Sequence, residues 1–141
     1  MPIFTKILHA NDGSEHAFKA LGMAVEIASD NRAELHMVSV EEISYLPDFI
    51  EEIREEKGVA ARRFRIVVDK ARAIAARRGV ELHTHTVVGH PVRTIVNLAA
   101  ELKADLLVIG AAGHSQLYER MIGSRADRIV HLAPCPVLVV K

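Results

Sequence analysis

Short apolar segments alternate with longer amphipathic segments along the whole chain, and this alternation constrains the fold more than any other feature of the sequence. The last two apolar segments, LLVI and VLVV, carry no polar side chain, which is typical of parallel strands covered on both faces. Strands that alternate with helices predict a parallel sheet with right-handed crossovers. We therefore expect an α/β fold with an open five-stranded parallel sheet and helices on both faces. The predicted strands cover residues 5–10, 34–40, 80–88, 106–109 and 137–140.

The segments between the strands show the apolar spacing of helices. We expect Ser14 and Ser124 to cap the first and last of them, and Pro91 suits the first turn of the third. The second is long, and a break near Gly58 is left open as an alternative. The predicted helices cover residues 14–29, 47–78, 91–102 and 124–132.

The composition excludes several classes of protein. The chain has 141 residues, which suits a single domain spanning residues 1–141. Its 18 basic residues balance 18 acidic ones and only 4% of the residues are aromatic, which argues against nucleic-acid binding. One cysteine fits a reducing compartment. No apolar run approaches the roughly 18 residues of a membrane span, and the first residues lack a secretion signal. We expect a cytoplasmic protein that does not associate with membranes.

Small residues follow the first and fourth predicted strands. The first strand runs into Asn11, Asp12 and Gly13, and the fourth runs into Gly110. Ligands of open parallel sheets bind beyond the carboxyl ends of the strands, where the strand order reverses. In the order 3-2-1-4-5 that reversal lies between these two strands, so both turns meet at one crevice. Asp12 is then placed to accept a hydrogen bond from a ribose hydroxyl or an adenine amino group.

The loop after the fourth strand has the spacing Gly110-x2-Gly113-x9-Gly123-Ser124. Glycines let backbone N–H groups approach an anion, and a helix N-terminus adds unpaired N–H groups and a partial positive charge. His114 and Arg125 can add charged contacts. The spacing therefore predicts a site for a di- or triphosphate, although it is not a Walker A motif. The alternative is that the glycines only form tight turns and that Ser124 only caps a helix.

These segments together resemble the universal stress protein family over nearly the whole chain. The resemblance is carried by residues 6–15 (KILHANDGSE), 89–91 (GHP), 104–110 (ADLLVIG) and 133–140 (APCPVLVV). The glycine spacing of the loop matches the G-x2-G-x9-G-S/T pattern of that family's ATP-binding branch. The resemblance implies a Rossmann-like α/β fold, for which we expect the strand order 3-2-1-4-5, together with a homodimer and bound ATP.

The resemblance also implies which residues contact ATP, and it assigns no catalytic residue. Adenine and ribose contacts are expected near Ala10, Asn11, Asp12 and Val40. A Mg²⁺ or Mn²⁺ ion, if bound, would be held through the phosphates, so no protein ligands are assigned to it. Contacts to the phosphates are expected from the loop and the helix after it: Gly110, Ala112, Gly113, His114, Gly123, Ser124 and Arg125.

The features together predict an ATP-binding stress-response protein, a homodimeric module whose nucleotide state changes its shape or its preference for an unknown protein partner. Weak ATP hydrolysis or nucleotidyl transfer is an alternative, although the sequence holds no Walker lysine and no evident general base. A dimeric scaffold that binds no nucleotide is a second alternative. The intact glycines of the loop argue against it.

The fifth predicted strand, in the order given, lies at an edge of the sheet. Its side chains carry no charge, and a bare apolar edge favours pairing with another chain. Antiparallel pairing with its own copy would close a two-fold dimer. The residues expected at that interface are Val137, Leu138, Val139 and Val140.

His83 and His85 alternate on the third predicted strand, so both point to the same face. Such a pair can bind zinc, but no third ligand is evident and we interpret them as structural. Acidic residues cluster in 41–57 and basic residues in 62–78, which indicates a solvated helix. A docking surface for a partner is the alternative interpretation of these charges.

Overall fold

The computed structural model describes residues 2–42, 50–112 and 122–141, and for residues 50–61 it describes the backbone alone. Strands and helices alternate in the order that the sequence predicts. The predicted long helix is described from Ile50 to Ala76 and runs through Gly58 without a break, whereas Pro47 lies outside the described residues. The elements are β1 (Lys6–Ala10), α1 (Glu15–Asn31), β2 (Glu34–Glu42), α2 (Ile50–Ala76), β3 (Leu82–Gly89), α3 (Pro91–Leu102), β4 (Leu106–Gly110), α4 (Ser124–Leu132) and β5 (Val137–Val140).

The strands form one parallel sheet in the order β3-β2-β1-β4-β5, which confirms the predicted fold class and strand order. β1 lies at the centre, where His9 is in register with Met37 of β2 and with Val108 of β4. β3 and β5 are the edge strands. The order reverses between β1 and β4, so the carboxyl ends of these two strands flank the predicted crevice.

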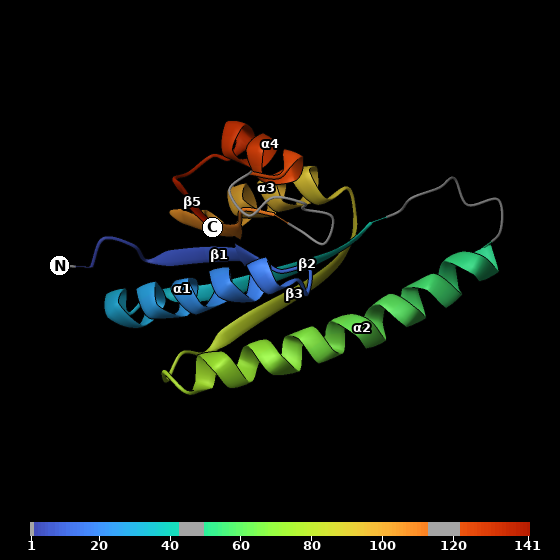
Figure 1. The fold of residues 1–141 in the computed structure, drawn as a ribbon, viewed down its shortest axis with the longest axis horizontal. Coiled ribbons are helices and arrows are strands. Elements are labelled where there is room, and N and C mark those ends of the chain that lie inside the picture. The colour runs from blue at the N-terminus through green and yellow to red at the C-terminus, as the bar shows by residue number, and fades with distance from the viewer. Residues whose placement is uncertain (1, 43–49, 113–121) are drawn as a thin grey trace.

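Helices cover both faces of the sheet, as Figure 1 shows. Successive side chains of a strand point to opposite faces, so Ile7 and Leu8 enter different cores. Ile7 packs in the core beneath α1 and α2, together with Phe64 of α2. Leu8 packs in the core under α3 and α4, together with Ile95 and Ile129. This second core continues into the crevice at the end of β1.

Local interactions set where α1 begins and ends. Ser14 is the N-cap, and its Oγ accepts a hydrogen bond from the Ala17 N–H at 3.2 Å, which confirms the predicted cap. Gly13 precedes it with a φ of +87°, a backbone conformation that glycine adopts without a Cβ clash. At the other end Arg32 takes a left-handed conformation with φ +52°, and its N–H bonds to carbonyls of the last turn. The turn between β1 and α1 is therefore held in one geometry.

The start of α4 differs from the sequence expectation. The N-cap is Gly123 and Ser124 is the first helical residue, so the prediction that Ser124 caps this helix is wrong. A long-range hydrogen bond explains the difference, because the Gly123 N–H donates to the carbonyl of Ala111, just after β4, at 2.6 Å. Gly123 keeps an extended backbone there, and the chain turns into the helix one residue later. This contact joins the first turn of α4 to the end of β4.

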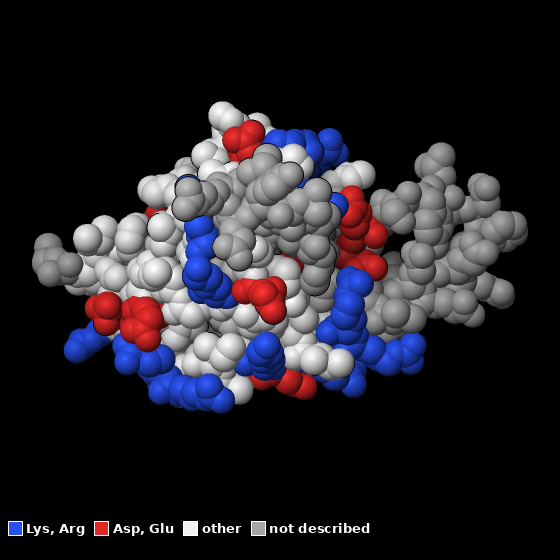
Figure 2. All heavy atoms as spheres, in the orientation of Figure 1, with Lys and Arg blue, Asp and Glu red and all other residues white. Residues whose placement is uncertain are grey.

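Exposed basic residues gather along α2, at the lower edge of the view in Figure 2. They belong to α2 from Arg62 onward and to the two residues that follow the helix, where the sequence places its cluster of Lys and Arg. None of the helices in the described part of the chain is both long and apolar enough to cross a membrane. The exposed basic residues are Arg62, Arg63, Arg65, Lys70, Arg72, Arg77 and Arg78.

Candidate functional site

A cavity of about 600 Å³ opens at the carboxyl ends of β1 and β4, where the strand order reverses. The volume lies in the range of small-molecule sites. The structure brings nine of the sequence-predicted residues together in its lining, whereas Gly113 and His114 lie outside the described residues. The nine are Ala10, Asn11, Asp12, Val40, Gly110, Ala112, Gly123, Ser124 and Arg125.

One side of the cavity is apolar, and sequence reasoning missed most of it. Val38 joins Val40 on the face of β2 that packs toward α3, while Pro91 and Ile95 come from the start of α3 and Ile129 from α4. The alternation of β2 was a usable signal, because Val38 and Val40 share a face. The sequence pattern of Pro91 predicts only the first turn of a helix. Ile95 and Ile129 have the sequence pattern of ordinary core residues.

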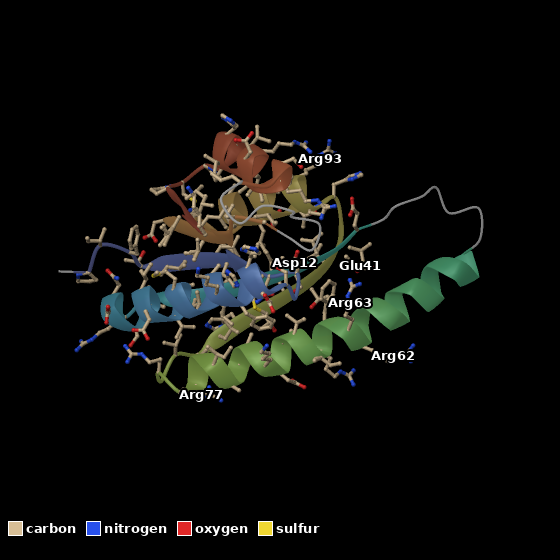
Figure 3. All side chains as sticks on the ribbon, in the orientation of Figure 1. Asp12, Glu41, Arg62, Arg63, Arg77 and Arg93 are labelled. Atoms are coloured by element: carbon tan, nitrogen blue, oxygen red, sulfur yellow. The ribbon has the colours of Figure 1, made fainter. Side chains whose placement is uncertain are left out.

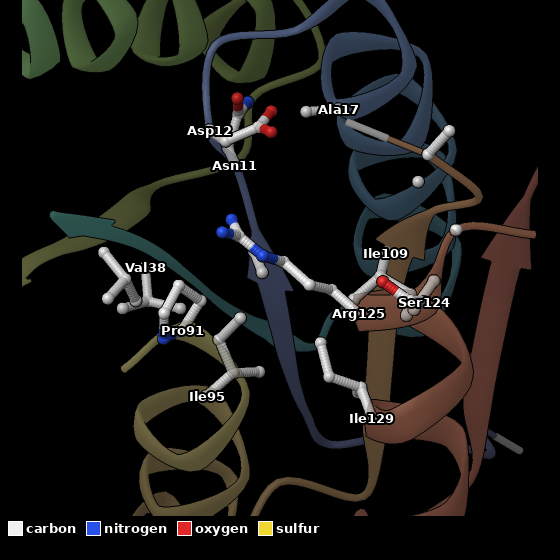
Figure 4. A pocket seen from close by; sticks show the side chains of 16 residues that line it. Asn11, Asp12, Ala17, Val38, Pro91, Ile95, Ile109, Ser124, Arg125 and Ile129 are labelled. Atoms are coloured by element: carbon white, nitrogen blue, oxygen red, sulfur yellow. The ribbon is translucent and has the colours of Figure 1, made fainter. Parts of the chain in front are cut away.

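Asp12 lies at the polar rim of the cavity (Figure 4). Its Oδ1 accepts a hydrogen bond from the Ser14 N–H at 3.0 Å, and the Oδ1 of Asn11 accepts one from the Gly13 N–H at 2.8 Å. The Ser39 hydroxyl of β2 donates to the Asn11 carbonyl at 2.8 Å. Side chains and backbone of the turn are thus bonded to one another. This rigid turn holds the Asp12 carboxylate at the end of β1.

The N-terminus of α4 forms the opposite rim of the cavity. Gly123 has no side chain to cap the helix, so the first N–H groups of α4 receive no bond from the N-cap side chain. Ser124 and Arg125 line the cavity beside these groups. The helix also contributes a partial positive charge at this end. An anion at this rim would meet N–H donors, a hydroxyl and a guanidinium.

His9 lies beneath the site rather than in it, since it is fully buried and does not line the cavity. Its Nδ1–H donates to the Val108 carbonyl at 3.0 Å, because a carbonyl only accepts. Its Nε2, like the Nδ2 of buried Asn11, has no hydrogen-bond partner in the part of the chain that is described. Burial lowers the pKa of His9 to about 4, outweighing the Val108 bond and the nearby Asp12 charge. His9 is therefore neutral at physiological pH.

Three histidines, His36, His83 and His85, form a cluster toward the amino ends of β2 and β3, away from the cavity. His83 and His85 share a face, as expected, and both rings stack on His36, with centroids 4.8 and 5.2 Å away. His36 Nε2–H donates to Glu34 at 2.6 Å, and its Nδ1 lies 2.9 Å from His85 Nε2.

The contacts in this cluster lower the pKa values of two of its residues, Glu34 and His85. The hydrogen bond from His36 lowers the pKa of the Glu34 carboxyl. Burial, reinforced by the charges of His36 and His83, lowers the pKa of His85. Among the described side chains, no group of three or more His, Cys, Asp or Glu residues is arranged to hold a metal ion.

Comparison with known proteins identifies a family whose sequences and folds this chain resembles. Residues 4–141 match the model of the universal stress protein family. The universal stress protein YxiE of Bacillus subtilis is 36% identical and is aligned over 99% of this chain and 100% of its own length.

Two solved structures support the same grouping. The universal stress protein UspA from Lactobacillus plantarum superposes with a TM-score of 0.86 at 28% identity, covering 97% of both chains. A universal stress protein solved in complex with cAMP has a TM-score of 0.76 at 27% identity, covering 98% of this chain and 97% of its own.

Proposed function

This chain belongs to the universal stress protein family, and on that premise we propose that it is a regulatory protein that binds adenine nucleotides, with ATP as the ligand, in the cavity between β1 and β4. The observation that carries the proposal is the two-sided character of that cavity. An apolar wall faces a rim of hydrogen-bonding and charged groups. A nucleotide has the same division between its base and its phosphates.

The apolar wall suits the base. Val38 and Val40 form its floor on β2, and Pro91 and Ile95 of α3 close its side. Burial of a flat aromatic ring against such side chains is favourable at about 25 cal/mol per Å² of apolar area. Asp12 is the acceptor that we assign to a ribose hydroxyl, because the turn that holds it is rigid and faces this wall.

The N-terminus of α4 suits the phosphates. The Gly123 N–H is engaged with Ala111, so the donors that we assign are the first N–H groups of the helix, the Ser124 hydroxyl and the Arg125 guanidinium. Gly113 and His114 are assigned to the same role on the loop spacing alone. A divalent cation would be held through the phosphates, and no described side chain is assigned to it.

A relative supports the class of ligand. The structure solved with cAMP shows a universal stress protein that binds an adenine nucleotide, and its chain is aligned over nearly all of this one. The cAMP complex supports adenine nucleotides as a class, and the loop spacing favours a polyphosphate within that class.

Homodimerisation through β5 is part of the proposal. β5 is an edge strand, and its residues 137–139 are only partly buried. The carbonyls of Pro136 and Val140 accept from Leu107 and Ala111 on the β4 side. Backbone groups of the alternate residues, Val137 and Val139, therefore point away from β4. An antiparallel copy of β5 would satisfy them.

Native mass spectrometry of the protein as purified, followed by calorimetry with ATP, tests the nucleotide proposal. We expect a co-purifying adenine nucleotide, or ATP binding after it is removed. Asp12→Asn keeps an acceptor for the Ser14 N–H, so the turn is expected to stay in place. This variant is expected to bind ATP more weakly, while its affinity for inorganic triphosphate stays almost unchanged. Asp30→Asn, the same change at an exposed position of α1, is the control. Absence of both co-purified nucleotide and ATP binding at millimolar concentration would overturn the proposal.

A further inference from the structure

An ion pair joins two elements that border the candidate nucleotide cavity, α4 and β2. The Arg125 guanidinium, on the first turn of α4, donates from Nη2 to the Oε2 of Glu42 at 2.5 Å. Glu42 is the last residue of β2, on the other side of the cavity from α4. The two residues are 83 positions apart in the sequence, so only the fold brings them together.

The Arg125 side chain lies in the space that a nucleotide would enter. Figure 4 shows it extending from α4 into the cavity, with its guanidinium between Asp12 and the apolar wall at Val38 and Pro91. This is the space assigned above to the nucleoside. A ligand that places its base on the apolar wall must therefore move the guanidinium away from Glu42.

We propose that the Glu42–Arg125 ion pair is a latch: it holds Arg125 across the cavity until a nucleotide enters, and the guanidinium then leaves Glu42 and binds the phosphates of that nucleotide. The inference rests on the proposed function, because it needs an adenine nucleotide as the ligand. It adds Glu42, which does not line the cavity, as a residue that sets the affinity. Carboxylate and phosphate present similar oxygens to a guanidinium, so Arg125 exchanges one anionic partner for another.

The exposure of the pair makes the latch reversible. The side chains of Arg125 and Glu42 are 57% and 46% exposed, and ion pairs of this kind are weak. The apparent affinity of a ligand falls by the fraction of protein in which its site is open. A latch of this strength lowers the affinity of every nucleoside ligand by roughly two- to fivefold. The phosphates of a nucleotide bind the released Arg125 guanidinium, and this contact compensates for the lowered affinity. Adenosine carries no phosphate, so its affinity stays lowered.

The neighbouring residue supplies a matched control. Glu41 pairs with Arg63 of α2 at 2.5 Å, and α2 covers the other face of the sheet. Figure 3 shows Glu41 and Arg63 on that side, between β2 and α2. Glu41→Gln therefore removes the same charge from the same strand, breaks an ion pair, and leaves the cavity untouched.

Calorimetry with adenosine, ATP and inorganic triphosphate tests the latch. Glu42→Gln is expected to bind adenosine and ATP roughly two- to fivefold more tightly than the unmodified protein, while Glu41→Gln binds them as before. Arg125→Gln separates the two roles of the arginine: adenosine binds more tightly by the same factor, and ATP and triphosphate bind roughly tenfold more weakly. The double variant gains no further affinity for adenosine, because either change alone opens the latch.

Three results would overturn the latch. The first is equal gains for Glu42→Gln and Glu41→Gln, which would indicate a general charge effect. The second is unchanged adenosine affinity in both Glu42→Gln and Arg125→Gln, which would leave the nucleotide proposal standing. The third is the absence of ATP binding in every protein tested, which would overturn the proposed function and the latch together. All of the substituted side chains are partly exposed, and circular dichroism confirms that each variant is folded.

Discussion

Gly110 lies so close to His16 that a Cβ atom on Gly110 would be 2.8 Å from the His16 carbonyl oxygen and 2.9 Å from its carbonyl carbon. Gly110 ends β4, and His16 is in the first turn of α1. Backbone atoms cannot move aside as a flexible side chain can. The first glycine of the loop pattern is therefore required by the packing of α1 on β4, whatever it also does for a ligand.

Replacing this glycine tests the packing requirement. Gly110→Ala should lower the free energy of unfolding by about 1–3 kcal/mol, because α1 or β4 must shift to admit the methyl group. Urea denaturation followed by circular dichroism measures the change. The control is Gly22→Ala, in the middle of α1, where an added Cβ meets nothing within 4 Å. That variant should gain about 0.5–1 kcal/mol from helix propensity. If both variants unfold alike, the close approach has no energetic consequence.

Buried His9 predicts a loss of stability in mild acid. Its pKa is lowered to about 4 by burial, whereas in the unfolded chain it returns to 6.5. Between these values the unfolded chain binds a proton that the folded protein does not, so stability rises with pH across this window. The folded protein should lose on the order of 3 kcal/mol as the pH falls from 6.5 to 4.

Urea titrations of the unmodified protein and of His9→Leu between these pH values measure the effect. The lowered pKa of His85 acts in the same direction in both proteins, so the difference between the two curves isolates His9. A difference that stays constant with pH would contradict the prediction. The absolute stability of His9→Leu at neutral pH does not enter the test.

Asp105 ties the start of β1 to the end of the α3–β4 connection. Its Oδ2 accepts hydrogen bonds from the Thr5 N–H and hydroxyl, both at 2.8 Å, and its Oδ1 accepts one from the Lys6 N–H at 3.1 Å. Burial raises the pKa of this carboxyl, but these hydrogen bonds outweigh it and the net pKa is lowered. Asp105→Asn should cost about 1–2 kcal/mol at neutral pH.

The sign of the pH dependence makes this prediction specific. A carboxyl whose pKa is lowered on folding contributes stability above its unfolded pKa, and this is lost as the pH falls through the folded pKa. The penalty of Asp105→Asn should therefore shrink in acid, once the pH has fallen below the ordinary value of 3.8 and through the lowered pKa of Asp105, so that the aspartic acid is protonated as well. Urea midpoints at neutral and acid pH give the comparison. A penalty that is the same at both would show that the charge of Asp105 contributes nothing.

The proposed dimer through β5 predicts a specific effect of proline. Val139→Pro removes an N–H that points away from β4. The hydrogen bonds between β4 and β5 therefore remain, while the free edge of β5 loses one donor. Each copy loses one bond, which should weaken the dimer by roughly 10- to 100-fold. Light scattering after size exclusion, over a range of concentrations, measures the mass. Val139→Ala keeps the N–H and is the control. A monomeric unmodified protein, or a proline variant that dimerises as well as the alanine variant, would rule out pairing through β5.

Much of the architecture was predictable because it depends on local patterns. The apolar runs of β4 and β5 identified two strands of the sheet, of which β4 is buried and β5 is a partly buried edge strand, and Ser14 identified the start of α1. The position of the cavity also followed, because the order reversal of a parallel sheet brings the ends of β1 and β4 together. The cap of α4 was mispredicted because a long-range bond from Gly123 to Ala111 decides it.

The site was predictable where a residue belongs to a segment with a distinctive sequence, at the end of a strand or at the start of α4. Asp12 and Ser124 belong to such segments, and both line the cavity. Ile95 and Ile129 line it as well, but their pattern is that of any core residue. Whether such a side chain faces the core or the cavity depends on how far α3 and α4 extend beyond the end of β1. That distance is a property of helix packing and leaves no trace in the sequence.

Periodicity and turn chemistry by themselves determined the strands, the helices and the general place of the pocket, because these depend on residues that are neighbours in the chain. Only the tertiary structure decided that Arg125 meets Glu42, that Gly110 meets His16 and that His36 joins His83 and His85. Each of these contacts joins residues far apart in sequence, and its geometry is set by the packing of whole elements, which fixes distances that no local pattern encodes.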